Sequence, residues 1–240
     1  NRINLSMKTA FILVEPAVPE NIGAAARAIK VMGFSQLWLI NPSNHLADPA
    51  KWLAHGSTEI LGQAKIYTSL EQAAAEVDYL VATTAKKRAS HIEYIDGNML
   101  GKTLEAKSSL IQTAGVVFGR EESGLTNVEM MLCDAVSYLP MATSYPSLNL
   151  SQAVMLYAYL LSQNKATKIS AKPEKPETHS EGFRKMKSNL LEIVKAIGIT
   201  EKHPIFGRIS QRLASASEKD MRLLNSVGEK LKAKLNRSDR

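Results

Sequence analysis

The first 164 residues alternate short apolar runs with segments of helical spacing. The apolar runs predict strands at residues 11–14, 36–40, 64–67, 79–84, 115–119 and 135–140. Between them, the clearest helix is expected at residues 19–32, with proline near its start and Gly33 after its end. Residues 148–163 predict a last, strongly apolar helix. This order is typical of an α/β fold with a mostly parallel sheet and helices on both faces.

The pattern changes after this region. Residues 165–181 lack periodicity and are rich in Lys, Pro, Glu and Ser, which predicts a solvated linker. Apolar residues recur at helical spacing beyond it, which predicts a small all-helical module. We therefore expect an α/β domain at residues 7–164, a linker at 165–181 and a helical module at 182–240.

Composition narrows the class of protein. The chain is 45% apolar and 22% charged, and none of its apolar runs approaches the ~20 residues that a membrane span needs. Cys133 is the only cysteine, so an internal disulfide or a cluster of thiolate metal ligands is excluded. The five histidines lack the spacing of a metal site, and we assign no metal. We expect a cytoplasmic protein that binds no membrane.

Charge is distributed unevenly along the chain. Residues 1–164 carry a net charge of −2, whereas residues 165–240 carry +9. A basic module beside a nearly neutral domain suits a polyanion such as nucleic acid, because each phosphate that it neutralises releases counterions. A solvated basic helical face is the alternative explanation.

Three segments place glycine, polar and charged residues near predicted strand or helix ends. The first is NIGAAARA, which holds Asn21, Gly23 and Arg27 on a helix with one nearly bare side, where another backbone or a ligand can approach. The second is FGREESGL at residues 118–125, directly after a predicted strand. The third comprises LPM at 139–141 and SLNLSQA at 147–153. Taken singly, these segments are also explained by a packed helix, an ordinary turn and a helix cap.

Together, the three segments resemble, position by position, the signature motifs of the SpoU branch of the SPOUT RNA methyltransferases, most closely its TrmJ/LasT-like members. The resemblance implies a C-terminal trefoil knot in the α/β domain and a pocket for S-adenosylmethionine. It also implies a homodimer in which Arg27 of one subunit faces the cofactor of the other. The implied cofactor-binding residues are Thr83, Thr84, Ala85, Gly119, Leu139, Met141, Pro146, Ser147, Leu148 and Asn149.

The reaction implied by the resemblance is methyl transfer from S-adenosylmethionine to a ribose 2′-hydroxyl of RNA, with tRNA favoured and rRNA possible. The implied catalytic residues are Arg27, Ser147 and Asn149, with Glu121 in an orienting role. A guanidinium stays protonated, so we expect Arg27 to grip a phosphate and to stabilise developing negative charge. The expected RNA-binding residues are Asn21, Arg27, Lys86, Lys87, Arg88, Arg208 and Arg212. The alternative is a knotted RNA-binding protein that has lost catalysis.

Overall fold

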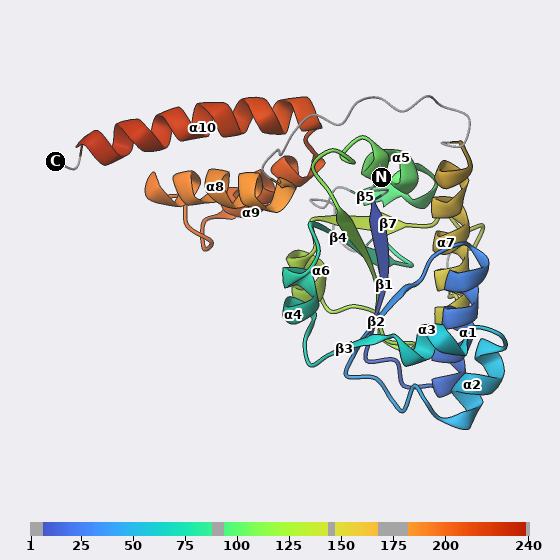
Figure 1. Ribbon diagram of the computed structural model, residues 1–240. Coiled ribbons are helices and arrows are strands. Elements are labelled where there is room, and N and C mark those ends of the chain that lie inside the picture. The colour runs from blue at the N-terminus through green and yellow to red at the C-terminus, as the bar shows by residue number, and fades with distance from the viewer. Residues whose placement is uncertain (1–6, 88–93, 144–146, 168–181, 239–240) are drawn as a thin grey trace.

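The computed structural model describes residues 7–87, 94–143, 147–167 and 182–238 (Figure 1). Its centre is a seven-stranded sheet in the order β3-β2-β1-β6-β4-β7-β5. All pairings between these described strands are parallel. The strands are β1 Lys8–Val14, β2 Gln36–Ile40, β3 Lys65–Tyr67, β4 Tyr79–Thr84, β5 Tyr94–Asp96, β6 Thr113–Phe118 and β7 Ala135–Tyr138. The mostly parallel α/β fold is thus confirmed, with β5 as a strand that the pattern did not predict.

Strand β1 shows how the sequence builds the core. All its residues after Lys8 are buried, as expected for a central strand of a parallel sheet. Phe11 and Leu13 belong to the hydrophobic cluster on one face of the sheet, and Ile12 and Val14 to the cluster on the other. Because side chains alternate between the two faces along a strand, one apolar run contributes to the apolar layers on both faces of the sheet.

Helices cover both faces of the sheet (Figure 1). Residues of α1, α2, α3, α5 and α7 belong to the cluster on one face, and residues of α4 and α6 to the cluster on the other. These helices are α1 Pro19–Val31, α2 Asp48–Ala54, α3 Thr58–Gly62, α4 Leu70–Ala75, α5 Gly97–Glu105, α6 Asn127–Leu132 and α7 Leu150–Thr167. No helix in the described part of the chain is long and apolar enough to span a membrane. The trefoil knot stays a prediction.

The bare side of α1 packs against a neighbouring backbone within the same chain. A Cβ atom on Gly23 would lie 2.0 Å from the carbonyl oxygen of Ala50 in α2. The close approach expected from the small residues is therefore made by α2, and this side of α1 is not available to a second subunit or a ligand.

The C-terminal module consists of α8 Phe183–Ala196, α9 Pro204–Ser215 and α10 Glu218–Ser238. It docks at the amino-terminal edge of the sheet. Phe183 is fully buried, and its ring meets that of Tyr79 edge-on at 5.2 Å. Its backbone N–H donates to the carbonyl of Leu110 at 3.1 Å, and Arg184 Nε donates to the carbonyl of Val77 at 2.8 Å. These carbonyls precede β6 and β4, which places the module at the start of those strands.

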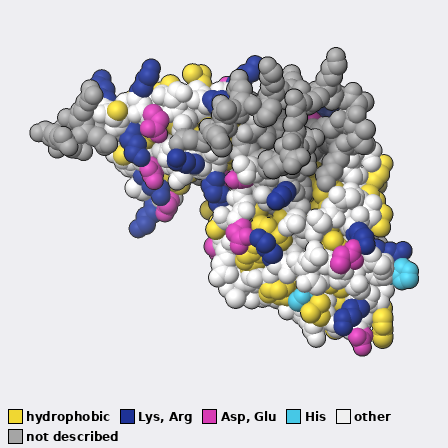
Figure 2. All heavy atoms as spheres, in the orientation of Figure 1, with side chains coloured by type: hydrophobic (Ala, Val, Ile, Leu, Met, Phe, Trp, Pro, Cys, Tyr) yellow, Lys and Arg dark blue, Asp and Glu magenta, His cyan; other side chains and the backbone are white. Residues whose placement is uncertain are grey.

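Two side chains of the α/β domain bind the carboxyl-terminal end of α9. Tyr79 Oη donates to the carbonyl of Ala214 at 3.0 Å, and Lys107 Nζ donates to that of Ala216. The last carbonyls of a helix lack intrahelical partners, and a cation there is favoured by the helix dipole. Lys107 is buried, and burial lowers its pKa to about 8. The module is thus held by specific polar contacts as well as by apolar packing. Figure 2 shows Lys and Arg side chains gathered on the surface of this module.

Candidate cofactor pocket and active site

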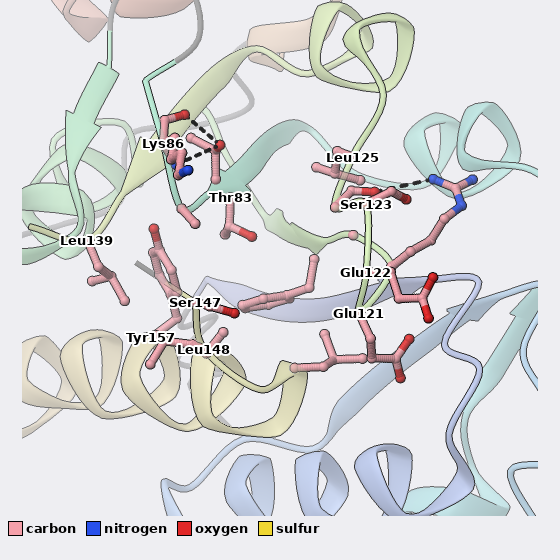
Figure 3. A pocket seen from close by; sticks show the side chains of 18 of the residues that line it. Thr83, Lys86, Glu121, Glu122, Ser123, Leu125, Leu139, Ser147, Leu148 and Tyr157 are labelled. Atoms are coloured by element: carbon pink, nitrogen blue, oxygen red, sulfur yellow. Dashed lines mark hydrogen bonds between the residues drawn. The ribbon is translucent and has the colours of Figure 1, made fainter. Parts of the chain in front are cut away.

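A cavity of about 320 Å³ lies at the carboxyl-terminal edge of the sheet, opposite the docked module (Figure 3). This volume lies within the range of small-molecule sites, about 300–1,000 Å³. Of the predicted cofactor-binding residues, those that line the cavity are Thr83, Thr84, Ala85, Gly119, Leu139, Met141, Ser147 and Leu148. Asn149 follows this wall without lining the cavity, and Pro146 lies outside the described residues.

The β6–α6 loop forms one wall because it folds back on itself. Arg120 and Gly124 exchange two backbone hydrogen bonds, at 3.3 and 3.0 Å. Gly124 has a φ of 68°, a conformation that favours glycine. A Cβ atom on Gly119 would lie 2.1 Å from the carbonyl carbon of Gly124. Both glycines of the FGREESG segment are therefore required by the shape of the loop.

Ion pairs fix the same loop to its neighbours. Arg120 Nε donates to Glu15 at 2.8 Å, and its two terminal nitrogens donate to Glu129 at 3.1 and 3.0 Å. Glu129 also completes a capping box with Thr126 at the start of α6. The hydrogen bond from Arg120 lowers the pKa of Glu15. Arg120, to which the sequence analysis gave no role, thus joins the end of β1, the pocket loop and α6.

Glu121 connects the three sequence motifs. Its carboxylate accepts hydrogen bonds from the backbone N–H groups of Ala17 and Val18, at 3.2 and 3.3 Å, just before α1. It also accepts one from Asn21 Nδ2 at 3.0 Å, and Asn21 Oδ1 accepts from Asn149 Nδ2 at 2.8 Å. Glu121 thus contacts the backbone before α1 and the side chain of Asn21, and none of the hydrogen bonds and ion pairs between described residues joins it to Arg27. Its orienting role stays a prediction.

The protonation of Glu121 gives a testable pH dependence. Burial alone would raise its pKa, but hydrogen bonds from Asn21 and from the backbone outweigh burial and lower the pKa below the ordinary 4.5. A lowered pKa stabilises the fold above the ordinary value, and this contribution is lost as pH falls through the folded-state pKa. The variant Glu121→Gln should therefore have a Tm deficit at neutral pH that shrinks below pH 4.5. Thermal unfolding from acidic to neutral pH would measure it.

Glu122→Gln is the matched control for this experiment, because Glu122 is the exposed neighbour in the same loop. Its Tm should follow that of the wild type at every pH. Equal Tm deficits in the two variants would contradict the specific role of Glu121.

Arg27 and Ser147 occupy different surroundings within one chain. Ser147 lines the cavity, whereas Arg27 lies on the exposed side of α1 and does not line it. Asn21 is on the same helix but nearer to the pocket loop, where it reaches Glu121. The predicted catalytic residues are therefore only partly brought together by a single chain.

Two of the predicted RNA-binding residues, Asn21 and Arg27, lie on α1. The others in the described part of the chain fall into two groups at opposite edges of the sheet. At the carboxyl edge, Lys86 lines the cavity, and Lys87 Nζ lies 4.1 Å from the ring centroid of Tyr138. Arg208 and Arg212 lie on α9, in the module at the amino edge. Arg88 lies outside the described residues.

Several residues of the cavity wall were missed by the sequence analysis. Tyr157 of α7 is buried, its ring meets Phe118 edge-on at 5.6 Å, and its hydroxyl donates to Ser137 at 3.1 Å. Burial raises the pKa of Tyr157 to about 12, so the phenol stays protonated. The sequence feature that could have identified Tyr157 as part of the cavity wall is a tyrosine within a strongly apolar helix. Further lining residues without a predicted role are Arg120, Glu122, Ser123, Gly124, Leu125, Leu150 and Ala153.

Residues 8–159 match the model of the SpoU rRNA Methylase family. This chain belongs to that family. It is 38% identical over 222 residues to the Escherichia coli K12 protein named uncharacterized tRNA/rRNA methyltransferase LasT, covering 92% of this chain and 96% of LasT. It is 32% identical over 210 residues to tRNA (cytidine/uridine-2'-O-)-methyltransferase TrmJ of the same strain, covering 85% of this chain and 84% of TrmJ.

This SpoU methylase is also similar to a solved structure in its fold. The crystal structure of TrmJ from Z. mobilis ZM4 superimposes with a TM-score of 0.65 and 27% identity, covering 93% of this chain and 99% of that one. The family match ends in α7, so these longer matches include the helical module as well. The TrmJ/LasT-like resemblance inferred from the three motifs is confirmed. Among the described residues, no group of His, Cys, Asp or Glu could hold a metal ion.

Proposed function

We propose that this SpoU methylase transfers a methyl group from S-adenosylmethionine to a ribose 2′-hydroxyl of RNA, with tRNA as the favoured substrate. The observation that carries the proposal is the cavity, because its wall is built from the second and third family motifs at the edge of the sheet where α/β proteins bind ligands. The 32% identity to TrmJ, whose name states 2'-O-methylation of tRNA, favours tRNA.

The residues present fit this cofactor. Phe118, Leu125, Leu139 and Leu148 give the cavity apolar walls suited to an adenine ring. Gly119 lets the loop that forms one wall fold closely on itself, because a Cβ atom there would meet the Gly124 and Leu125 backbone. Lys86 and Glu122 add a cation and an anion to the lining, which suit the carboxylate and the ammonium of a methionine group. When bound, S-adenosylmethionine supplies an electrophilic methyl group.

The protein's contribution in this proposal is alignment and electrostatics. Orientation of two reactants is worth up to ~7–11 kcal/mol in well-aligned systems. Ser147 lies at the cavity, where its hydroxyl can bind the ribose. Asn149 is fixed by hydrogen bonds to Asn21 and Ser151, so it supports the start of α7. Arg27 binds the adjacent phosphate and stabilises negative charge on the attacking oxygen.

The position of Arg27 supports the proposal of a homodimer. Because this side chain does not line the cavity of its own chain, we propose that it acts at the cavity of a second copy. The outer sides of α1 and α7 expose Val31, Leu156 and Tyr159, at 65%, 39% and 49% of their surfaces. Apolar surface of this kind on packed neighbouring helices suits a symmetric interface. A cytoplasmic location stays part of the same proposal.

Methyl transfer from labelled S-adenosylmethionine to total tRNA and to rRNA tests the function. Incorporation into tRNA is the expected result. Cofactor and RNA binding without incorporation into either RNA would contradict it and would favour a knotted RNA-binding protein that has lost catalysis.

The basic module gives a separate prediction about RNA affinity. Arg208→Gln with Arg212→Gln should weaken tRNA binding and flatten its salt dependence by about one unit of log–log slope for each phosphate that the variant no longer binds. Cofactor affinity should not change, because the module is docked at the other edge of the sheet. Filter binding of tRNA at several salt concentrations measures the tRNA affinity and its salt dependence.

Lys102→Gln on α5 is the control for removal of an exposed positive charge. An equal effect of this variant would contradict a specific role of α9.

A further inference from the structure

Arg120 binds two carboxylates that come from different elements of the fold. Its Nε donates to Glu15, just after β1, at 2.8 Å, and its two terminal nitrogens donate to the two oxygens of Glu129 in α6. Only 25% of the Arg120 side chain and 17% of the Glu129 side chain are exposed. A partly buried bidentate pair of this kind is among the stronger polar contacts in proteins, because it fixes both groups in one geometry.

Glu15 has an unusual backbone conformation. Its φ is 46°, in the left-handed region that residues other than glycine seldom adopt. The Glu15 N–H donates to the carbonyl of Ile40 at 2.8 Å, which continues the pairing of β1 with β2 by one residue. Strained backbone of this kind persists only where surrounding contacts impose it, and it concentrates at functional sites. In this conformation the Glu15 carboxylate meets Arg120 at the edge of the sheet that holds the cavity.

The residue after Arg120 holds the same part of the chain. Glu121 accepts hydrogen bonds from two backbone N–H groups just before α1, while Arg120 binds Glu15. Two consecutive residues of the β6–α6 loop therefore hold the segment between β1 and α1. On its other side, the loop is fixed to α6 through Glu129. The cavity wall is thus anchored to two elements, and Arg120 contacts both.

We propose that Arg120 is a positioning residue for the cofactor, which binds Glu15 and Glu129 together and so keeps the β6–α6 loop in the shape that admits S-adenosylmethionine. This inference rests on the proposed function. Arg120 lines the cavity, but its Nε and both terminal nitrogens donate to carboxylates, so it acts on the ligand through the loop. Without Arg120 the lining residues remain, but the cofactor must order the loop as it binds, which lowers affinity.

Cofactor affinity and loop exchange test this role in the full chain. Arg120→Gln should weaken binding of S-adenosylmethionine about tenfold in calorimetry, as expected for residues of one contact network. Hydrogen exchange of the amides at residues 119–125, measured without ligand, should become about tenfold faster. Arg120→Lys should bind the cofactor with intermediate affinity, because an ammonium group cannot form the bidentate pair.

The Glu15 contact is tested by a double-mutant cycle. Glu15 is the better partner to change, because Glu129 also completes the capping box of α6. Glu15→Gln should weaken cofactor binding less than Arg120→Gln does, since the contact to Glu129 remains. The double variant should bind no more weakly than Arg120→Gln alone, because Glu15 acts through Arg120.

Glu76→Gln is the matched control, because it breaks an ion pair with Lys65 outside the cavity lining. The Glu76 side chain is 48% exposed, against 47% for Glu15. This variant should keep wild-type cofactor affinity and loop exchange.

Three results would overturn the role of Arg120 alone. They are wild-type affinity or wild-type loop exchange in a folded Arg120→Gln protein, additive effects in the double variant, and an equal effect of Glu76→Gln. A wild type that does not bind the cofactor would contradict the proposed function, and this inference with it.

Discussion

Arg27→Ala is expected to bind S-adenosylmethionine as the wild type does but to transfer methyl groups ~10²–10³ times more slowly. The expected loss follows from removing a preorganised charge that acts on the transition state. The fold should be retained, because Arg27 lies on the exposed side of α1. Calorimetry of cofactor binding and single-turnover methyl transfer to tRNA measure the two effects separately.

The same variant tests whether the active site is shared between subunits. Ser147→Ala should also be impaired, because Ser147 lines the cavity. If the two residues serve one site from different chains, exchange of subunits between the two variants creates dimers with one intact site. Half of the randomly exchanged dimers are mixed, so activity should return to about one quarter of the wild-type value.

Two results would contradict this account of Arg27. No recovery despite proven subunit exchange would mean that both residues act at the site of one chain. Full activity of Arg27→Ala would mean that Arg27 has no catalytic role.

Gly119→Ala is expected to weaken binding of S-adenosylmethionine about 5-fold to 150-fold, because overpacking costs about 1–3 kcal/mol. The added Cβ would lie 2.1 Å from the Gly124 carbonyl carbon and 2.2 Å from the Leu125 nitrogen, so the loop must move. These are backbone atoms of the cavity wall, and their displacement changes the shape of the cavity. Gly119→Val should have a larger effect.

Gly207→Ala is the matched control, since a Cβ atom on Gly207 meets no atom within 4 Å. It should leave cofactor affinity unchanged. Wild-type affinity in a folded Gly119→Ala protein would mean that the cofactor pocket is not where we place it. Thermal unfolding of both variants separates loss of the fold from loss of binding.

Much of the fold follows from local patterns. The apolar runs predicted the long strands β1, β2, β4 and β6, because a strand buried on both faces is apolar throughout. The three-residue strand β5 was missed, since its Tyr94, Ile95 and Asp96 give no clear pattern and it is only half-buried. The docking of the module on Tyr79 and Lys107 was also missed. A buried lysine that holds the end of a distant helix has no signature in periodicity.

The candidate site depends on contacts between segments far apart in the chain. Glu121 meets Asn21 across 100 residues, and Asn149 meets Asn21 across 128. No local pattern specifies such pairs, so the family resemblance was needed to group the three motifs. Arg120 shows the limit of that resemblance, because its contacts to Glu15 and Glu129 hold the pocket loop without forming part of the expected catalytic set.

Mapping the transferred methyl group on the RNA tests the central claim most directly. After reaction with labelled S-adenosylmethionine, tRNA would be digested to nucleosides and the position of the label determined by mass spectrometry. The account predicts a methyl group on the ribose 2′-oxygen, produced by the wild type and strongly reduced in Arg27→Ala. A methyl group on a base, or no labelled nucleoside from a protein that binds the cofactor, would contradict it.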